Sequence, residues 1–138
     1  MNLALQLTSA FLNEKDFKHR VDEEDNLITT GIGGLDNKGS MKFHIIFDDD
    51  GGSVGIRVFE YCAFPKEKTT KMYQVCSKMN EAFRWVKFYV DEEENTITLA
   101  DDAVIQLDSC GEEVFELLLR MSSIGDDAYP EFMRAIWS

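Results

Sequence analysis

Residues 40–64 decide the fold, and they read SMKFHIIFDDDGGSVGIRVFEYCAF. Within Ser40–Asp48, apolar side chains alternate with polar ones, which is the period of two expected of a half-buried β-strand. The glycines in the turn Asp49–Gly52 accept positive φ angles, and Ser53–Phe64 then continues as a second, longer strand. The segment therefore predicts an antiparallel β-hairpin.

A helix and a second hairpin are predicted directly after this segment. Pro65 suits the first turn of a helix, where no backbone N–H is needed, and apolar spacing carries the helix to about Phe83. Alternating side chains then predict a strand over Trp85–Asp91. The acidic turn Glu92–Asn95 leads from it into a short strand over Thr96–Ala100.

The two ends of the chain predict further helices. A stripe of apolar residues with a 3.6-residue period predicts a helix over Asn2–Glu14, followed by a weaker extended stretch over Lys18–Thr30 and a loop over Gly31–Asp36. Ser109 and Glu112 have capping-box spacing, and the apolar pattern behind them fits one helix or two. Helices and antiparallel strands are segregated, which indicates an α+β fold with helices packed on one sheet face.

The composition describes an acidic chain of one domain. The chain has 138 residues, of which 44% are hydrophobic, and this is enough for one hydrophobic core. We therefore predict a single domain over residues 1–138. The chain has 26 acidic and 14 basic side chains, which gives a net charge of −12. Because such a chain repels phosphate backbones and anionic bilayers, we expect neither nucleic acid nor a membrane as a partner.

The sequence also predicts a cytoplasmic location. The longest unbroken apolar run is Tyr61–Phe64, whereas a transmembrane helix needs about 20 residues. The N-terminal stretch has no basic region ahead of its apolar residues, so we do not expect a signal peptide. An odd, scattered set of cysteines (Cys62, Cys76 and Cys110) suits a reducing compartment better than a disulfide framework.

We predict neither a metal site nor a cofactor. The motif Gly31-Ile32-Gly33-Gly34 lacks the third glycine of a dinucleotide fingerprint and the Lys-Ser/Thr of a P-loop, so it is interpreted as a turn. The acidic clusters lack the ligand spacing of an EF-hand and are interpreted as solvated turns: Asp22–Asp25, Asp48–Asp50 and Asp91–Glu94. With His19 and His44 as the two histidines, a structural zinc site is not expected.

No catalytic residue is assigned from the sequence, and we predict that the protein is not an enzyme. Cys110 lies next to a predicted helix N-terminus, a position that can activate a thiol. His44 faces away from the apolar side of its strand, so a surface role is expected. A small enzyme that uses Cys110 or an acidic cluster remains an alternative.

A set of outward-facing apolar side chains predicts a protein interface. If the alternation holds, the sheet surface away from the helices carries Ile46, Phe59, Tyr61, Trp85 and Tyr89. Another helix could cover these residues, or a bulge could reverse the register, and the pattern leaves both open. If they are exposed, they form a patch for a partner, and a second copy is the simplest one. We therefore predict a homodimer.

The region over Phe64–Leu99 contains a distinctive set of residues: Phe64-Pro65-Lys66-Glu67, Val75, Met79-Asn80, Val86-Lys87-Phe88-Tyr89-Val90-Asp91 and Ile97-Thr98-Leu99. With these residues it resembles the YbjN-like family of bacterial sensory transduction regulators. In that family a strand ends in proline, a helix ends in a Leu-Asn type pair, and a strand, an acidic turn and another strand follow. Here Met79-Asn80 stands where that pair would be.

The resemblance implies the fold of the type III secretion chaperones: a twisted antiparallel sheet with helices, often assembled as a dimer. It implies a non-enzymatic protein-binding or regulatory module with an unknown partner. The alternative within binding proteins is a secretion chaperone that holds an effector segment. Independently of the resemblance, the strand and helix patterns predict one shared core with Phe43, Ile45, Met79, Val86, Phe88, Leu118 and Phe132.

Overall fold

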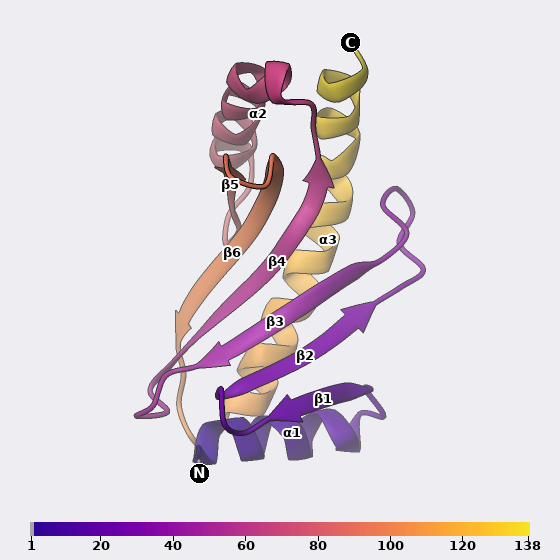
Figure 1. Ribbon diagram of the computed structural model, residues 1–138. Coiled ribbons are helices and arrows are strands. Elements are labelled where there is room, and N and C mark those ends of the chain that lie inside the picture. Colours follow the sequence, from indigo (N-terminus) through magenta and orange to yellow (C-terminus); the bar gives the residue numbers. More distant parts are fainter. Residues whose placement is uncertain (1) are drawn as a thin grey trace.

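The computed structural model describes residues 2–138, which form one antiparallel six-stranded sheet and three α-helices (Figure 1). In their spatial order the strands are β1 (His19–Asp22), β2 (Leu27–Ile32), β3 (Met41–Phe47), β4 (Ser53–Ala63), β6 (Thr96–Val104) and β5 (Lys87–Asp91). The helices are α1 (Leu3–Glu14), α2 (Thr69–Ala82), which follows the 3-10 turn η1 (Lys66–Lys68), and α3 (Cys110–Trp137). The predicted α+β class, with an antiparallel sheet and helices on one face, is confirmed.

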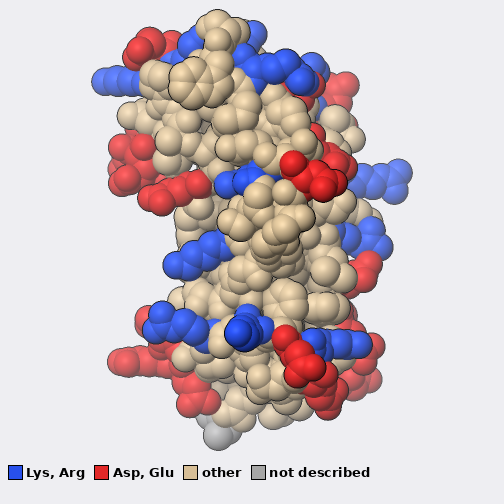
Figure 2. Space-filling model, turned by 90° about the vertical axis from the view of Figure 1, so that its right-hand side faces the viewer, with Lys and Arg blue, Asp and Glu red and all other residues tan. Residues whose placement is uncertain are grey.

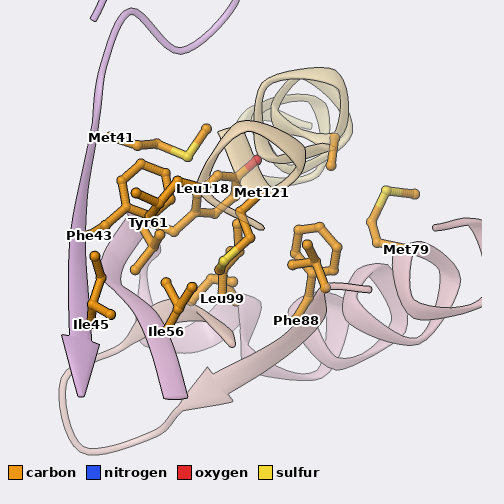
Figure 3. Packing of buried hydrophobic residues seen from close by; sticks show 14 of the residues in the cluster. Met41, Phe43, Ile45, Ile56, Tyr61, Met79, Phe88, Leu99, Leu118 and Met121 are labelled. Carbon is orange, nitrogen blue, oxygen red and sulfur yellow. The ribbon is translucent and has the colours of Figure 1, made fainter. Parts of the chain in front are cut away.

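The hairpin of β3 and β4 forms as its alternation predicts. Every second side chain of β3 is buried, and Ile45 pairs in register with Ile56 of β4. These side chains meet the helices in one core, part of which Figure 3 shows. All seven residues predicted to share this core are buried: Phe43, Ile45, Met79, Val86, Phe88, Leu118 and Phe132.

A β-bulge interrupts the alternation of β4. The register against β6 shifts between Val58 and Cys62, and Glu60 within the shift has a φ of +53°. Tyr61 is therefore turned to the helix side, where it is 1% exposed and its hydroxyl donates to the carbonyl of Gly125 at 2.5 Å. The expectation that Tyr61 faces outward is wrong, because β4 has two more residues than β6 between the pairs Val58–Leu99 and Cys62–Ile97, and Tyr61 lies in this irregular segment.

The C-terminal apolar pattern forms a single helix, α3, with Pro130 inside it. A proline within a helix removes the N–H that would bond the carbonyl four residues earlier, here that of Asp126. Asn37 Nδ2 donates to this carbonyl at 3.0 Å, and Asp126 Oδ1 accepts the backbone N–H groups of Asn37 (2.9 Å) and Lys38 (2.8 Å). The loop between β2 and β3 thus supplies the bond that the proline removes.

The N-terminus of α3 differs from the predicted capping box. Ser109 is the N-cap residue, but its side chain makes no hydrogen bond to the helix backbone. Its hydroxyl instead donates to Glu113 Oε1 at 2.9 Å, and the same oxygen accepts the N–H of Gln106 at 3.0 Å. The proposed pairing of Ser109 with Glu112 is therefore wrong.

The edge of the sheet at β5 is sealed by a side chain of α2. Asn80 Oδ1 accepts the N–H of Phe88 at 2.7 Å, and Asn80 Nδ2 donates to the carbonyl of Phe88 at 3.0 Å. The amide group thus replaces a neighbouring strand, which protects the edge from pairing with another chain. Trp85 lies outside β5, contrary to the prediction, and its φ of +74° belongs to the turn before the strand.

The weak extended stretch near the N-terminus forms two strands instead of one. β1 and β2 pair as a hairpin across the acidic turn, with Val21 opposite Ile28. Gly31 and Ile32 belong to β2, so the predicted loop begins at Gly33 and not at Gly31.

Candidate protein-binding face

One surface of the sheet, which we call the open face, lies away from the helices. Figure 1 shows α1, α2 and α3 behind the sheet, and no helix of residues 2–138 covers its front. The strand registers and the burial pattern place these side chains on the open face: Arg20, Asp22, Leu27, Thr29, Gly31, Lys42, His44, Ile46, Gly55, Arg57, Phe59, Lys87, Tyr89, Thr98, Ala100 and Asp102.

The register arranges the open face in transverse rows, because residues paired between adjacent strands lie side by side. One row crosses all six strands and consists of Arg20, Thr29, His44, Arg57, Ala100 and Lys87. It holds three permanent cations and no carboxylate, so we call it the cationic row. Two residues further along the strands, on one side of the row, lie Lys42, Phe59 and Tyr89, and on the other side lie Leu27, Ile46 and Asp102.

Three of the five residues predicted for the interface lie on the open face, namely Ile46 (39% exposed), Phe59 (48%) and Tyr89 (40%). They flank the cationic row on both sides. Trp85 is also exposed, but Arg120 of α3 stacks on its ring at 5.7 Å, which places it on the helix side of the sheet. Tyr61 is buried, as described above. The structure thus separates the predicted set into an open-face group and two residues elsewhere.

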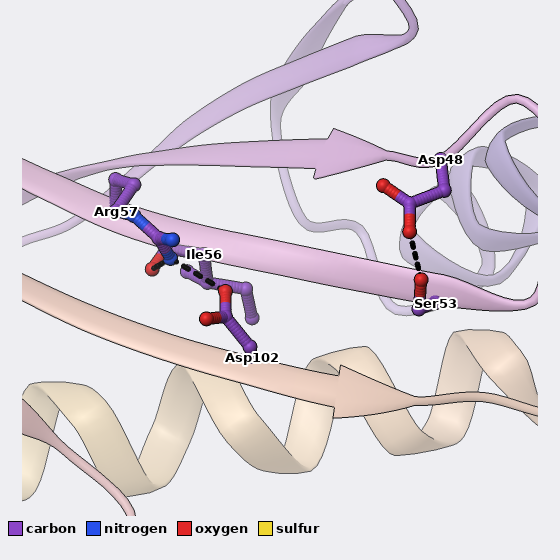
Figure 4. Close-up of polar contacts among 5 residues, drawn as sticks. All are labelled: Asp48, Ser53, Ile56, Arg57 and Asp102. Carbon is purple, nitrogen blue, oxygen red and sulfur yellow. Dashed lines mark hydrogen bonds and ion pairs between the residues drawn. The ribbon is translucent and has the colours of Figure 1, made fainter.

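A shallow hollow of about 450 Å³ lies on the open face beside the cationic row. Its wall includes Ile46 and Gly55. Figure 4 shows the Arg57–Asp102 pair in the wall of this hollow, where Arg57 Nη1 donates to Asp102 Oδ1 at 2.8 Å. Nη1 of Arg57 also donates to the carbonyl of Ile56 at 3.0 Å. The neighbouring contact drawn in Figure 4 joins the Ser53 hydroxyl to the Asp48 carboxylate.

His44 occupies the middle of the cationic row. Its ring meets that of Phe59 edge-on, with the centroids 5.1 Å apart. Partial burial lowers the pKa of His44 below its ordinary value, and the neighbouring charge of Lys42 lowers it further. At neutral pH the imidazole is therefore uncharged, and the permanent charge of the row comes from Arg20, Arg57 and Lys87.

The surroundings of Cys110 differ from those of a reactive thiol. Cys110 is 1% exposed, and its Sγ lies 3.6 Å from the carbonyl of Ala4 and 3.6 Å from the Thr8 hydroxyl. Burial raises the pKa values of the other two thiols, Cys62 and Cys76, to about 12. All three cysteines are buried and free of disulfides.

The acidic clusters occupy turns, as predicted, and their carboxylates accept bonds from the turn backbone. Asp91 Oδ1 accepts the N–H groups of Glu93 and Glu94, and Asp50 Oδ1 accepts that of Gly52. Within residues 2–138, no group of three or more His, Cys, Asp or Glu side chains is arranged to hold a metal ion.

One charged residue lies on the covered side of the sheet, and the sequence analysis did not single it out. Asp101 pairs in register with the buried Ile56 and is 8% exposed. Its Oδ2 is buried without a hydrogen-bond partner among residues 2–138. Burial, reinforced by the charge of Asp102, raises the pKa of Asp101 to about 6. The carboxylate thus destabilises the core at neutral pH.

The remaining surface mixes both signs of charge. Figure 2, a side view, shows uncharged residues along the middle and acidic and basic side chains mainly toward the margins. Over residues 2–138, no helix has both the length and the hydropathy required to cross a bilayer.

The comparisons with known proteins first define a structural class. The crystal structure of YbjN from E. coli, described there as "a putative transcription regulator", matches with a TM-score of 0.65 at 10% identity, covering 92% of each chain. The crystal structure of the ExsC–ExsE complex matches with a TM-score of 0.52 at 11% identity, covering 89% of this chain and 90% of that one. At these identities the similarity concerns the fold, which is of the type III secretion chaperone kind.

The family follows from the sequence itself. The model of the YbjN family, described as "Putative bacterial sensory transduction regulator", matches residues 6–132. The chain therefore belongs to the YbjN family. No curated protein matches the sequence. The suspected family and the chaperone-like fold are confirmed, and the pair Met79-Asn80 gains a physical role, since Asn80 seals the edge at β5.

Proposed function

We propose that this protein is a non-enzymatic binding module that receives a partner protein on the open face of its sheet. The observation that carries the proposal is the position of Ile46, Phe59 and Tyr89, three exposed apolar side chains on the one sheet surface that the helices leave free. Large apolar groups gathered on an accessible face are typical of protein-binding surfaces. The YbjN family membership favours a regulatory role, and we propose a cytoplasmic location for it.

A secretion chaperone that holds an effector segment is the second candidate function. The fold similarity to ExsC, solved as a complex with ExsE, supports it. A genomic neighbourhood with secretion genes would favour the chaperone, and an effector bound in extended form would establish it. An enzyme that uses Cys110 is disfavoured, since that thiol is buried.

Affinity capture with matched variants tests the proposal. The double variant Phe59→Asp/Tyr89→Asp places two charges on the open face, whereas Trp85→Asp changes an equally exposed aromatic residue on the helix side. Quantitative mass spectrometry of host proteins should find a partner held by the wild type and by Trp85→Asp but lost from the double variant. Loss from Trp85→Asp alone would move the binding site to the helix side.

The homodimer stays a prediction. Light scattering in 0.15 M salt should give about twice the 15.8 kDa of the chain at micromolar concentration. A mass of one chain at every concentration would refute it. A dimer that the double variant leaves intact would place the contact on the helices and leave the open face for a different partner.

A further inference from the structure

The charge of the open face contrasts with that of the whole chain. The chain carries a net charge of −12, yet the cationic row holds Arg20, Arg57 and Lys87 and no acidic residue. Lys42 adds a fourth cation two residues before His44 on β3, opposite Gly31 of β2. A second hollow, of about 390 Å³, lies at the β1 end of the face and is lined by Lys18, Arg20 and Lys42 without a carboxylate.

Asp22 and Asp102 lie on the open face outside the cationic row, and the turns at the ends of the strands carry further acidic residues. The turns that follow β1 and β3 carry Glu23–Asp25 and Asp48–Asp50, and they lie together, since Asn26 Nδ2 donates to Asp49 Oδ1 at 2.7 Å. A third acidic turn, Glu92–Glu94, joins β5 to β6. An anionic ligand is therefore repelled from the strand ends and attracted to the middle of the face.

We propose that the open face binds an acidic segment of a partner protein, with its carboxylates along the cationic row and its apolar side chains against Ile46 on one side and Phe59 and Tyr89 on the other. This inference deepens the proposed function and rests on it. Five strand spacings of about 4.8 Å make the row about 24 Å long, which an extended segment of roughly seven residues spans. The hollow above Gly55 accepts an apolar side chain of such a segment next to Arg57.

Arg57 is the central residue of this recognition. It pairs with Asp102, but both of its hydrogen bonds, to Asp102 and to the Ile56 carbonyl, come from Nη1, and a guanidinium has five N–H donors. An incoming carboxylate thus finds donors on the same group and competes with Asp102 alone. Removing the charge of Asp102 should therefore strengthen the binding of an acidic segment, whereas a purely apolar contact would not respond in this way.

A second copy is a poorer occupant of the same face. A two-fold axis through the centre of the face, directed along the row or across it, would stack the cationic row on its own copy. An axis along the row would place Arg57 against Arg57, and an axis across its centre would place Arg20 against Lys87, in both cases at short range, where salt screens little. A nucleic acid is also disfavoured, because its dense phosphate charge is repelled by a chain of net charge −12.

Fluorescence anisotropy with defined peptides tests the proposal. The probe is a labelled twelve-residue peptide in which Glu alternates with Leu and Phe, and the matched control peptide has Lys in place of every Glu. The Glu peptide should bind the wild-type protein, more weakly at 0.3 M than at 0.05 M salt, and the Lys peptide should not bind. Equal or better binding of the Lys peptide would overturn the proposal.

Variants of equal charge change locate the site. The double variant Arg20→Gln/Arg57→Gln should bind the Glu peptide about tenfold more weakly, since each exposed pair contributes modestly. The control Lys66→Gln/Lys71→Gln removes two exposed cations of η1 and α2 and should bind like the wild type. An equal loss in both double variants would refute a site on the open face, since only the overall charge would then matter.

Two further variants keep the test decisive. If circular dichroism shows that the Arg57 variant is not folded, Arg20→Gln/Lys42→Gln replaces it, because both of these side chains are exposed. Asp102→Asn should bind the Glu peptide a few-fold more tightly, and weaker binding would contradict the role given to Arg57.

Preferential binding of an oligouridylate would assign the row to nucleic acid, and a variant that changes only the oligomeric state would assign it to a second copy.

The failure of this inference is distinguishable from that of the proposed function. If Phe59→Asp/Tyr89→Asp loses the captured host partner while the Glu peptide does not bind, the open face binds proteins of another chemistry. If no partner depends on Phe59 and Tyr89, the proposed function itself fails, whatever the peptides do.

Discussion

The same strands form both faces of the sheet, but the two faces differ in composition and exposure. We call the face that packs against the helices the covered face. On the covered face, Phe43, Ile45, Ile56 and Phe88 are almost fully buried against the helices. On the open face, the residues between them are charged, aromatic or small, and several are more than a third exposed. The covered face therefore stabilises the fold, whereas the open face is free to differ in sequence and to bind. Substitutions on the two faces should separate stability from binding.

The largest expected effect contrasts two phenylalanines, one on each face. Phe88 is 1% exposed and packs against Tyr61 and Phe132, whereas Phe59 is 48% exposed. Phe88→Ala should lower the free energy of unfolding by about 3–5 kcal/mol, and Phe59→Ala by less than about 1 kcal/mol. Urea unfolding measures both. A loss under 1 kcal/mol for Phe88→Ala would contradict the assignment of faces.

A pair of glycines gives the next contrast. A Cβ at Gly111 of α3 would lie 2.5 Å from the Cβ of Phe11, so α1 and α3 would have to move apart. A Cβ at Gly55 on the open face would meet the side-chain ends of Asp102 (2.9 Å) and Arg57 (3.4 Å), which can move. Gly111→Ala should cost about 1–3 kcal/mol, and Gly55→Ala should cost clearly less in the same denaturation experiment. Equal costs would mean that the open face is packed as rigidly as the helix layer.

Much of the covered face was predictable, because alternation and helical periodicity report burial directly. Phe43 and Ile45 in β3, and Leu118 and Phe132 in α3, follow from spacing alone. Tyr61 does not, since it lies in the bulge, where β4 has two more residues than β6 and the alternation is interrupted without a local signal. Such an insertion is decided by how β4 pairs with β6, which is a tertiary property.

The open face was predictable only residue by residue. Alternation places Ile46, Phe59 and His44 outward, but the cationic row depends on the register of five strand pairs and on the order in which β6 is inserted between β4 and β5. Arg57 and Lys87 are 30 positions apart in the sequence and come into one row through that order. The hydrogen bond from Asn37 to the carbonyl of Asp126 likewise depends on the tertiary structure. Pro130 shows in the sequence that a backbone N–H is missing, but the sequence does not show which loop compensates for it.

The smallest expected effect concerns Asp101, the charged residue that breaks the apolar pattern of the covered face. Burial and the charge of Asp102 raise the pKa of Asp101 to about 6, above its ordinary value of 3.8. Between these two pH values the folded state binds more protons than the unfolded state, so stability falls as the pH rises from about 4 to 6 and the cost is fully present above 6. Asp101→Asn removes this charge and should raise the free energy of unfolding by about 1 kcal/mol at pH 8.

That gain should shrink as the pH falls from 6 toward 4, because Asp101 of the folded wild type is protonated below about 6, whereas in the unfolded chain it is protonated only below its ordinary value of 3.8. The matched control is Asp36→Asn, because Asp36 is an exposed acid in the loop between β2 and β3 and its charge does not contribute to the raised pKa of Asp101. Urea denaturation of both variants from pH 4 to pH 8 makes the comparison. A destabilised Asp101→Asn at pH 8 would show that the carboxylate is held by favourable contacts, and the covered face would then tolerate a charge as the open face does. A gain that does not change with pH would instead assign the effect to packing. Asparagine has nearly the same shape as aspartate but does not ionise, so an effect of charge must depend on pH.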